Sequence, residues 1–369
     1  MIYTAPNREQ LPTIGQVMTM VRELMRQMPI RHRMPYDEPV EGDDLFLLNR
    51  TASGLFTLKP NITMQPCLFY GDNDYHRTKR TTWSELDKSN LIVDNVLREE
   101  FEVTMRSHPL YQLFRNGIPT RRNSVRIINP FGIATAYGFP SPMLPFTSSM
   151  DVAAFFATHR LNAQTGQWTA ISERNEQGEI NVGVLYMFEL ALPFPMTLGL
   201  SVIGMQAFQR PGAQRMFALN LADEENLNSH RFVTGFQFRQ NPEDITEIVN
   251  GFQNGELLTP DELIAHKAHD ILTTRRVSEA AFGVNCRNNP HQDHAANRRK
   301  LQAAGIEIVE DAGHLYSEDE LNREFYPNAV ERWEEMFGHV VAVHPGFDEL
   351  LDDILEFPNT PAGHEFFRR

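Results

Sequence analysis

Residues 129–160 constrain the fold more than any other part of the chain. This segment reads NPFGIATAYGFPSPMLPFTSSMDVAAFFATHR, so glycine and proline punctuate an apolar stretch before a run of hydroxyl residues. Residues 131–138 predict a short helix that ends near Gly138, because glycine accepts the left-handed conformation common at helix C-termini. The prolines within residues 140–145 then predict an ordered loop or edge segment, since each fixes φ and restricts the residue before it.

A second helix is predicted immediately after this loop, at residues 149–160. Ser149 is a suitable N-cap, and Asp151 places an acid in the first turn, where the helix dipole favours it. Apolar residues then recur at helical spacing as far as Leu161. We therefore expect this helix to bury an aromatic face.

The rest of the chain alternates between helical and extended patterns. Helices are predicted at residues 13–28, 91–105, 242–251, 293–304 and 347–357, after Ser317, and from Thr259, where Pro260 and the capping-box acid Glu262 follow. Strands are predicted at residues 45–48, 55–58, 67–71 and 183–192, and ending near Cys286. Residues 183–192 are apolar on both faces, which is typical of a central strand. Glu189 breaks that pattern and is expected at the solvent-reaching end, with a polar cleft as the alternative.

Charge and composition argue against several classes of protein. The chain carries 48 acidic and 34 basic residues, a net charge of −14, which disfavours broad binding to nucleic-acid phosphates. It has 41% hydrophobic residues but no apolar run of about 18 residues, so we expect a globular protein without a membrane helix. The N-terminus lacks a cationic region followed by an apolar stretch, which favours a cytoplasmic location.

The two cysteines predict neither a disulfide framework nor a metal site. Cys67 and Cys286 are expected to be buried thiols in a reducing compartment. Cys286 lies near His291 and His294, but this cluster has no fourth ligand and an uncommon spacing for zinc. We therefore expect no bound metal.

The central segment resembles the FRG domain family. That family's signature combines Gln-His-Tyr-Gly-x-Pro-Thr-Arg, Leu-Leu-Asp-Trp/Phe-Thr and a helix ending in Ala-x-x-Phe-Ala. The matching residues are Tyr137, Gly138, Pro140, Leu144, Phe146, Thr147, Ala153, Phe156 and Ala157. The chain departs from the signature at Thr135-Ala136, Ser141-Pro142 and Pro145, which replace Gln-His, Thr-Arg and Asp.

Other segments extend the resemblance in both directions. Upstream, the family has Phe-Arg-Gly at the end of an early strand, then a Trp and a Glu-Phe pair on a helix. Downstream, it has an Arg, a Gln-Gln-Gly-x-Phe motif and a closing Phe/Tyr-Pro turn. The corresponding residues are Phe69-Tyr70-Gly71, Trp83, Glu100-Phe101, Arg210, Gln214, Phe217 and Phe325-Tyr326-Pro327. Tyr70 replaces the family Arg, so it can stack on a flat ligand but cannot form a charged fork with phosphate.

The resemblance implies an ADP-ribosyltransferase-like fold of the α+β class. In this fold two small sheets are split around a cleft that binds NAD, and helices flank them here at both termini. The implied divisions are an N-terminal helix and linker at 1–44, an FRG-like domain at 45–340 and a C-terminal helical extension at 341–369.

The same resemblance implies the site residues. A first-strand residue grips NAD, a Ser/Thr motif shapes the nicotinamide pocket, and an acid in a third motif aids cleavage. The implied cofactor-binding residues are Tyr70, Gly71, Tyr137, Thr147, Ser148 and Arg210, and the implied catalytic residues are Gln214, Thr147 and Glu189. Gln214 occupies the position of the acid but supplies no negative charge to an oxocarbenium-like transition state. Transfer is therefore expected to depend on whether Glu189 reaches the cleft.

Two functions follow from these observations. The first is an NAD-dependent or nucleotide-binding domain that transfers ADP-ribose, in a bacterial or phage conflict setting. The second is a catalytically inactive module that keeps the fold and binds a protein partner. The missing Arg, His and acid favour the second function, whereas the retained aromatic and hydroxyl residues favour the first. Each residue also has a structural interpretation: Tyr70 as a core aromatic, Thr147 as a backbone cap and Gln214 as a loop amide.

Overall fold

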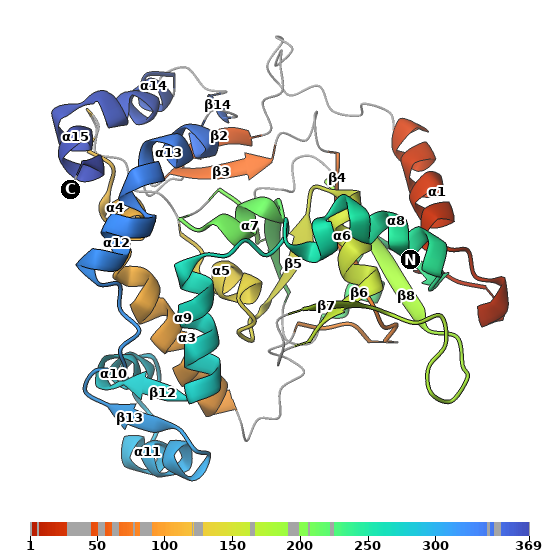
Figure 1. Cartoon of the computed structure of the whole chain (residues 1–369), viewed down its shortest axis with the longest axis horizontal. Coiled ribbons are helices and arrows are strands. Elements are labelled where there is room, and N and C mark those ends of the chain that lie inside the picture. The colour runs from red at the N-terminus through yellow and green to blue at the C-terminus, as the bar shows by residue number, and fades with distance from the viewer. Residues whose placement is uncertain are drawn as a thin grey trace.

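The structure is a computed structural model with strands at the centre and helices around them (Figure 1). It describes residues 2–5, 7–27, 46–50, 56–60, 66–76, 78–81, 91–119, 121, 128–162, 167–190, 199–205, 207–221, 225–337, 340–342 and 348–368. The architecture is a mixture of helix and strand, consistent with the predicted α+β class. Trp83, Gly54 and the whole of the predicted linker, residues 29–44, lie outside the described residues.

A seven-stranded sheet forms the centre of the fold. Its order is β1-β11-β8-β4-β5-β10-β9, and every neighbouring pair is antiparallel except β1 and β11. The strands are β1 (Ile2–Tyr3), β4 (Cys67–Asp72), β5 (Met143–Thr147), β8 (Val182–Glu189), β9 (Leu200–Val202), β10 (Met216–Asn220) and β11 (Val233–Arg239). The prediction of a central strand at 183–192 is confirmed by β8, and Glu189 is exposed at its end.

Three smaller sheets surround the large one. They pair β14 with β2 and β2 with β3, β12 with β13, and β6 with β7. Their strands are β2 (Phe46–Arg50), β3 (Phe56–Pro60), β6 (His159–Leu161), β7 (Trp168–Ala170), β12 (Arg276–Ser278), β13 (Glu307–Val309) and β14 (Val340–Ala342). The antiparallel pairing of β2 with β3 confirms the predicted strand pair near the N-terminus.

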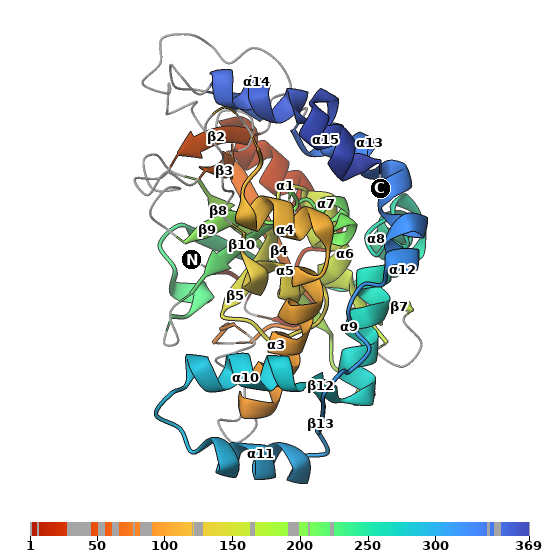
Figure 2. The same ribbon diagram turned by 90° about the vertical axis from the view of Figure 1, so that its left-hand side faces the viewer.

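The helices fall into an N-terminal and a C-terminal group. The first comprises α1 (Ile14–Gln27), α3 (Leu91–Arg106), α4 (Pro109–Asn116), α5 (Pro130–Ala136), α6 (Met150–Thr158), α7 (Gln209–Ala213) and α8 (Pro242–Gly251). The second comprises α9 (Leu263–Thr274), α10 (Glu279–Asn288), α11 (His294–Ala303), α12 (Glu318–Glu324), α13 (Ala329–Phe337), α14 (Asp348–Glu356) and α15 (Pro361–Phe367). In Figure 1 the helices from α10 and α11 to α14 lie along the left side of the molecule. In Figure 2 the same helices run from α14 at the top, through α13 and α12 at the right, to α10 and α11 at the bottom.

Helices α1 and α6 cover one face of the sheet. Apolar residues of α1 at helical spacing pack with small residues of α6 against the strands, as their periodicity predicts. The cluster includes Ile14, Val17, Val21, Ala153, Ala157, Leu185, Phe236 and Phe238. The Ser149 hydroxyl accepts a hydrogen bond from the Val152 N–H, which confirms the predicted cap of α6. Leu161, expected on the buried face, is 43% exposed because it lies in β6, beyond the end of the helix.

The C-terminal helices share a core with the rest of the fold. Trp333 on α13 is fully buried, and its Nε1 donates to the Ile354 carbonyl oxygen at 2.8 Å. The Phe357 ring packs against the indole at a tilt, and the Phe367 ring packs edge-on. All of these side chains belong to one apolar cluster with residues of β3, α3 and the large sheet. The segment at 341–369 therefore has no core of its own among the described residues.

A buried carboxylate joins α3 to the C-terminal half. Glu100 is 1% exposed and accepts hydrogen bonds from the N–H and hydroxyl of Ser278, at 2.7 and 2.6 Å. Its other oxygen lies 3.0 Å from Nδ1 of His314. A buried carboxylate needs such partners, so Glu100 fixes the position of β12 and of the loop that carries His314.

The proline-rich segment forms a strand rather than a loop or edge. Residues 143–147 form β5, which pairs along its whole length with β10. By contrast, β5 pairs with β4 only at Phe69 and Thr147. Pro145 has no N–H, so a strand containing it is easier to accommodate where one neighbouring ladder is interrupted. The sheet opens on the β4 side of Pro145.

Two other local predictions were wrong. Cys286 lies in α10 rather than at the end of a strand, and it is only half-buried. The helix predicted from Thr259 begins at Leu263 instead, and the Thr259 hydroxyl donates to the Gly255 carbonyl oxygen. The capping-box acid is used elsewhere in the fold, by the N-terminus of α7. No described helix is long and apolar enough to cross a membrane.

Candidate functional site

A cavity of about 840 Å³ lies where β4 and β5 separate. Residues of β4, β5 and β10 form its base, and α6 with β7 contributes one wall. The ends of α5 and α7 form the opposite wall, and the segment from Thr259 to Leu272 closes a third side. The volume lies within the range of small-molecule binding sites.

The structure brings most of the sequence-predicted site residues to this cavity. Those that line it are Tyr70, Gly71, Tyr137, Thr147, Arg210 and Gln214. They come from β4, α5, β5 and α7, which are well separated in the chain. Ser148 follows β5 but is not among the lining residues, and Glu189 is exposed at the end of β8, also outside the lining. The predicted catalytic carboxylate therefore does not reach the cavity.

Tyr70 is held by neighbouring aromatic rings and by a lysine. Its ring centroid lies 5.7 Å from that of Tyr186 and 5.8 Å from that of Phe146. The Lys79 ammonium lies 5.7 Å from the Tyr70 ring and 2.8 Å from an Asp72 oxygen. Burial opposes the charge of Lys79, but Tyr70 and Asp72 together raise its pKa above the ordinary value. The Tyr70 ring is consequently fixed in position beside a permanent cation.

Gly71 permits close contact between β4 and α6. A Cβ built on this residue would overlap the carbonyl oxygen of Ala153 and crowd the N–H of Ala157. No side chain can occupy that space without moving α6. Glycine at this position therefore fixes the distance between one wall of the cavity and its base.

Thr147 and Gln214 each retain one hydrogen-bonding function. The Thr147 Oγ1 accepts the Ser149 N–H at 3.0 Å, which leaves the hydroxyl proton available for donation. The Gln214 Nε2 donates to the Leu258 carbonyl oxygen at 3.0 Å. Its Oε1 has no hydrogen-bond partner within the described ranges. A ligand in the cavity could accept from the first group and donate to the second.

Glu262 links the three helices around one side of the cavity. Its carboxylate, 8% exposed, accepts from the Tyr137 hydroxyl at 2.6 Å and from the N–H groups of Gln209 and Arg210, both at 2.9 Å. The N–H groups belong to the start of α7, where a negative charge is favourable. Burial and the adjacent Glu262 raise the pKa of Tyr137 well above its ordinary value. The tyrosine therefore remains a neutral donor.

Arg210 covers the Tyr137 ring. Its guanidinium carbon lies 4.9 Å from the ring centroid, and one of its terminal nitrogens is 3.4 Å from the Ala136 carbonyl oxygen. The side chain is half-buried and contributes a positive charge to the lining. Arg210 thus provides the cavity with a cation for a carboxylate or phosphate group.

Sequence reasoning missed an acid and two histidines at the cavity. Asp261, His266 and His269 all line it, and Asp261 is the one carboxylate residue in the described lining. The Asp261 carboxylate accepts a hydrogen bond from His266 Nε2, and both side chains are mostly exposed. His266 and His269 share a helix face because they are three residues apart. The three-residue spacing of the two histidines was the available sequence signal. Without the fold, no feature of the sequence placed this histidine pair in the same site as Thr147 or Gln214.

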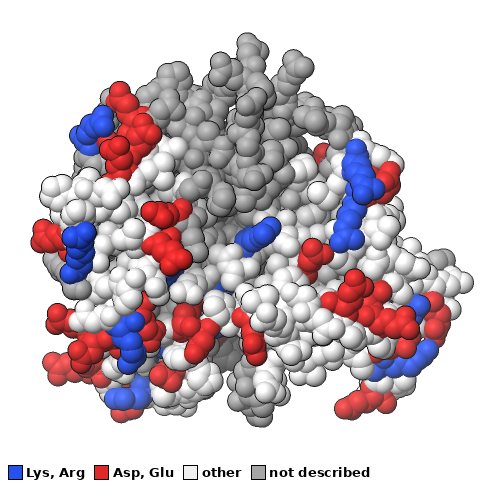
Figure 3. All heavy atoms as spheres, turned by 45° about the horizontal axis from the view of Figure 1, so that its top comes forward, with Lys and Arg blue, Asp and Glu red and all other residues white. Residues whose placement is uncertain are grey.

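One face of the molecule carries interspersed charge (Figure 3). On the face shown in Figure 3, the acidic side chains of the described residues are spread widely, with basic side chains among them. The described basic residues on this face are isolated rather than gathered into one positive area. Selectivity for an anionic group would therefore come from individual residues such as Arg210.

Comparisons of the chain with known protein families, curated proteins and solved structures found no match. The residues that line the cavity are therefore the basis on which a function can be inferred.

Proposed function

We propose that the cavity binds NAD or a related nucleotide, in an FRG-like domain with an ADP-ribosyltransferase-like cleft. The observation that carries this proposal is the convergence of Tyr70, Thr147 and Gln214 on one cavity from three separate segments. The limited pairing between β4 and β5 is also compatible with a sheet divided around a cleft.

The lining offers chemistry suited to a nucleotide. Arg210 is a cation for a phosphate, while Thr147 can donate and Gln214 can accept hydrogen bonds. Phe156 and Trp168 add aromatic surface for a flat ring on the opposite wall. This combination of an apolar lining with a few polar groups is typical of small-molecule sites.

Transfer of ADP-ribose requires more than binding. The bond between the ribose C1′ and nicotinamide breaks, nicotinamide leaves with the electron pair, and an acceptor nucleophile bonds to C1′ as it loses a proton. A carboxylate that opposes the developing positive charge favours this step. Asp261 is the candidate for that charge, and His266 is the candidate base for the acceptor proton.

The test is calorimetric titration of NAD into the wild-type chain and two variants, Thr147→Val and Gln214→Ala. Each variant removes one hydrogen-bonding function available to a ligand, together with the bond of that side chain to Ser149 N–H or to the Leu258 carbonyl oxygen. We expect NAD affinity to fall by about fivefold to tenfold. Ser148→Ala is the matched control, because Ser148 is adjacent to Thr147 but outside the lining. Thermal unfolding of every variant checks that it is folded.

Release of nicotinamide, followed by chromatography, separates binding from chemistry. We expect Asp261→Asn to bind NAD and to lose nicotinamide release. Wild-type protein that binds NAD without releasing nicotinamide would indicate a cleft without catalysis. Folded wild-type protein that produces no heat with NAD would refute the nucleotide proposal and favour the protein-binding module, which the exposed acid–histidine pair at this site would also suit.

A further inference from the structure

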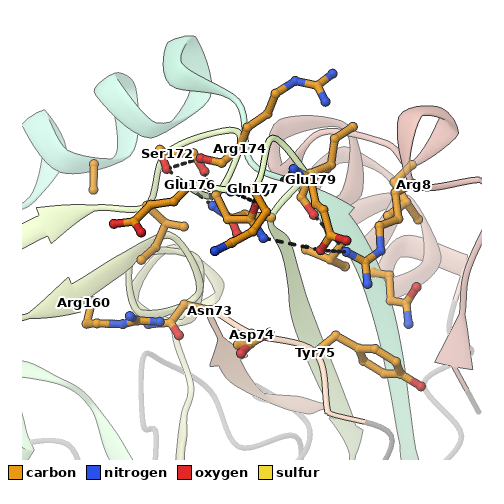
Figure 4. A pocket seen from close by; sticks show the side chains of 18 of the residues that line it. Arg8, Asn73, Asp74, Tyr75, Arg160, Ser172, Arg174, Glu176, Gln177 and Glu179 are labelled. Atoms are coloured by element: carbon orange, nitrogen blue, oxygen red, sulfur yellow. Dashed lines mark hydrogen bonds and ion pairs between the residues drawn. The ribbon is translucent and has the colours of Figure 1, made fainter.

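A second cavity, of about 1180 Å³, adjoins the first, with which it shares two lining residues. Figure 4 shows this second cavity. It lies between residues 73–75, which follow β4, and residues 171–182, which precede and begin β8. Strands β6 and β7, Gln237 of β11 and the N-terminal segment around Thr4 complete its lining. The two cavities share only Leu161 and Asn162, so a ligand in this one would contact a largely different set of residues.

Carboxamide side chains form a large part of the polar lining of the second cavity, beside charged side chains. The carboxamides are Asn73, Asn162, Asn175, Gln177, Asn181 and Gln237. Some of these groups are already used within the protein: the Nδ2 atoms of Asn73 and Asn181 donate to backbone carbonyl oxygens, and Oδ1 of Asn175 accepts two backbone N–H groups. The Oδ1 atoms of Asn73 and Asn181 remain as acceptors, so a ligand hydroxyl can donate to them. Tyr75 adds a flat aromatic surface at the same site (Figure 4).

Gln237 is the group that most strongly indicates a ligand. It lies on β11, is 8% exposed, and its Oε1 accepts from the Thr4 hydroxyl at 2.6 Å. Its Nε2 has no hydrogen-bond partner among the described residues. This nitrogen is also accessible to solvent, unlike the fully buried polar atoms of the same residues that lack a partner. The amide nitrogen therefore opens towards the cavity that Gln237 lines. Because this donor reaches the cavity without a protein partner, a bound group or water has to satisfy it.

The charges around the cavity balance one another. Arg8 lies 3.7 Å from Glu179, and Arg174 lies 2.8 Å from Glu9. Arg160 extends towards Asn73 in Figure 4 and has no ion-pair partner in the described part of the chain. Two further carboxylates, Asp74 and Glu176, also line the cavity. A phosphate in this cavity would be attracted by one unpaired cation, Arg160, and repelled by the carboxylates of Asp74 and Glu176. Binding of a polyanion is therefore disfavoured.

We propose that this second cavity binds a neutral, hydroxyl-rich ligand of the carbohydrate class. Sugar hydroxyls can pair with the carboxamides in both directions, and the apolar face of a sugar ring can pack on Tyr75. Gln237 Nε2 donates to a ligand hydroxyl, and the Arg160 guanidinium donates to another. The proposal is independent of nucleotide binding at the first cavity.

The experiment is saturation-transfer NMR of the full chain with maltotriose and with triacetylchitotriose. We expect saturation transfer to at least one of these trisaccharides. Addition of NAD should leave the Kd of the trisaccharide unchanged, because the two ligands would not compete for one cavity. Gln237→Glu keeps the acceptor for Thr4 and removes the donor, so it should weaken sugar binding by about fivefold. Arg160→Gln, on an exposed strand, provides a second variant that does not alter a buried group, and we expect it to weaken binding by about threefold.

Asn250→Ala is the control, because this exposed carboxamide on α8 lies outside both cavities. It should bind the sugar as the wild type does. The proposal is overturned if neither trisaccharide receives saturation, or if binding survives both Gln237→Glu and Arg160→Gln. The proposal is also overturned if pyrophosphate binds this cavity more tightly than the trisaccharides do. The same holds if a capped tripeptide displaces the bound trisaccharide. A separate titration with NAD shows whether the first cavity binds NAD, so failure of the carbohydrate proposal can be distinguished from failure of the nucleotide proposal.

Discussion

Removal of the Glu262 carboxylate should destabilise the wall of the first cavity. In Glu262→Ala, the N–H groups of Gln209 and Arg210 and the hydroxyl of Tyr137 all lose their acceptor. A buried donor without a partner costs about 1–3 kcal/mol, but solvent reaches the exposed start of α7 and reduces this cost. We expect a total loss of about 3 kcal/mol in the free energy of unfolding.

The assay is thermal unfolding, compared with Tyr137→Phe and Asp261→Ala. For a chain of 369 residues, the unfolding entropy is roughly 0.8 kcal/mol per kelvin, so Glu262→Ala should lower the Tm by about 4 °C. Tyr137→Phe removes one of the three hydrogen bonds and should lower the Tm by about 1 °C. Asp261→Ala removes the neighbouring, exposed carboxylate and should cost less than about 0.5 kcal/mol.

Two results would refute this reasoning. One is a Tm for Glu262→Ala within about 1 °C of the wild type, which would mean that the three donors find other partners. The other is an equal loss in Asp261→Ala, which would show that general charge and not the buried network sets the stability. The double variant Glu262→Ala/Tyr137→Phe should lose little more than Glu262→Ala alone, because both changes break the same contact.

Two further predictions concern packing and pH. Gly71→Ala should lower the free energy of unfolding, measured with denaturant, by at least about 3 kcal/mol, because the added Cβ would overlap the Ala153 carbonyl oxygen. Gly251→Ala is the control: its added Cβ has no atom within 4 Å, so stability should change by less than about 0.5 kcal/mol. Equal effects of the two substitutions would contradict the packing argument. Burial, with a smaller effect of Arg332, lowers the pKa of His108 in the folded protein to about 3. The stability that neutral His108 contributes is therefore complete above pH about 6.5 and is lost as the pH falls towards 3. Wild type should therefore lose about 3 kcal/mol more than His108→Asn between pH 6.5 and 4, as measured by urea unfolding, whereas parallel pH profiles would exclude a neutral buried His108.

Local sequence signals predicted much of the secondary structure. The periodicity of α1, the Ser149 cap of α6 and the apolar run of β8 each gave the correct element. Gly138 has a φ of +87°, as expected for the end of the preceding helix. These signals are reliable because the interactions behind them act within one helical turn or along one strand.

The same local reasoning failed where a residue is used by a distant segment. Pro145 suggested a loop or edge, but pairing with β10 made its segment a strand inside the sheet. Glu262 matched a capping box, yet its carboxylate caps α7, which lies about fifty residues earlier. Neither partner was visible in the surrounding sequence.

The candidate site divides in the same way. Tyr70, Gly71, Tyr137, Thr147, Arg210 and Gln214 were selected from motifs along the sequence, and the structure places them around one cavity. Asp261 and His266 were not selected, because their place in the cavity with Thr147 depends on how α9 and the residues before it pack in the tertiary structure. By itself, the sequence determined the local helices and strands and a set of candidate residues. The tertiary structure decided which side chains share a cavity, because long-range packing is set by the whole core rather than by neighbours in the chain.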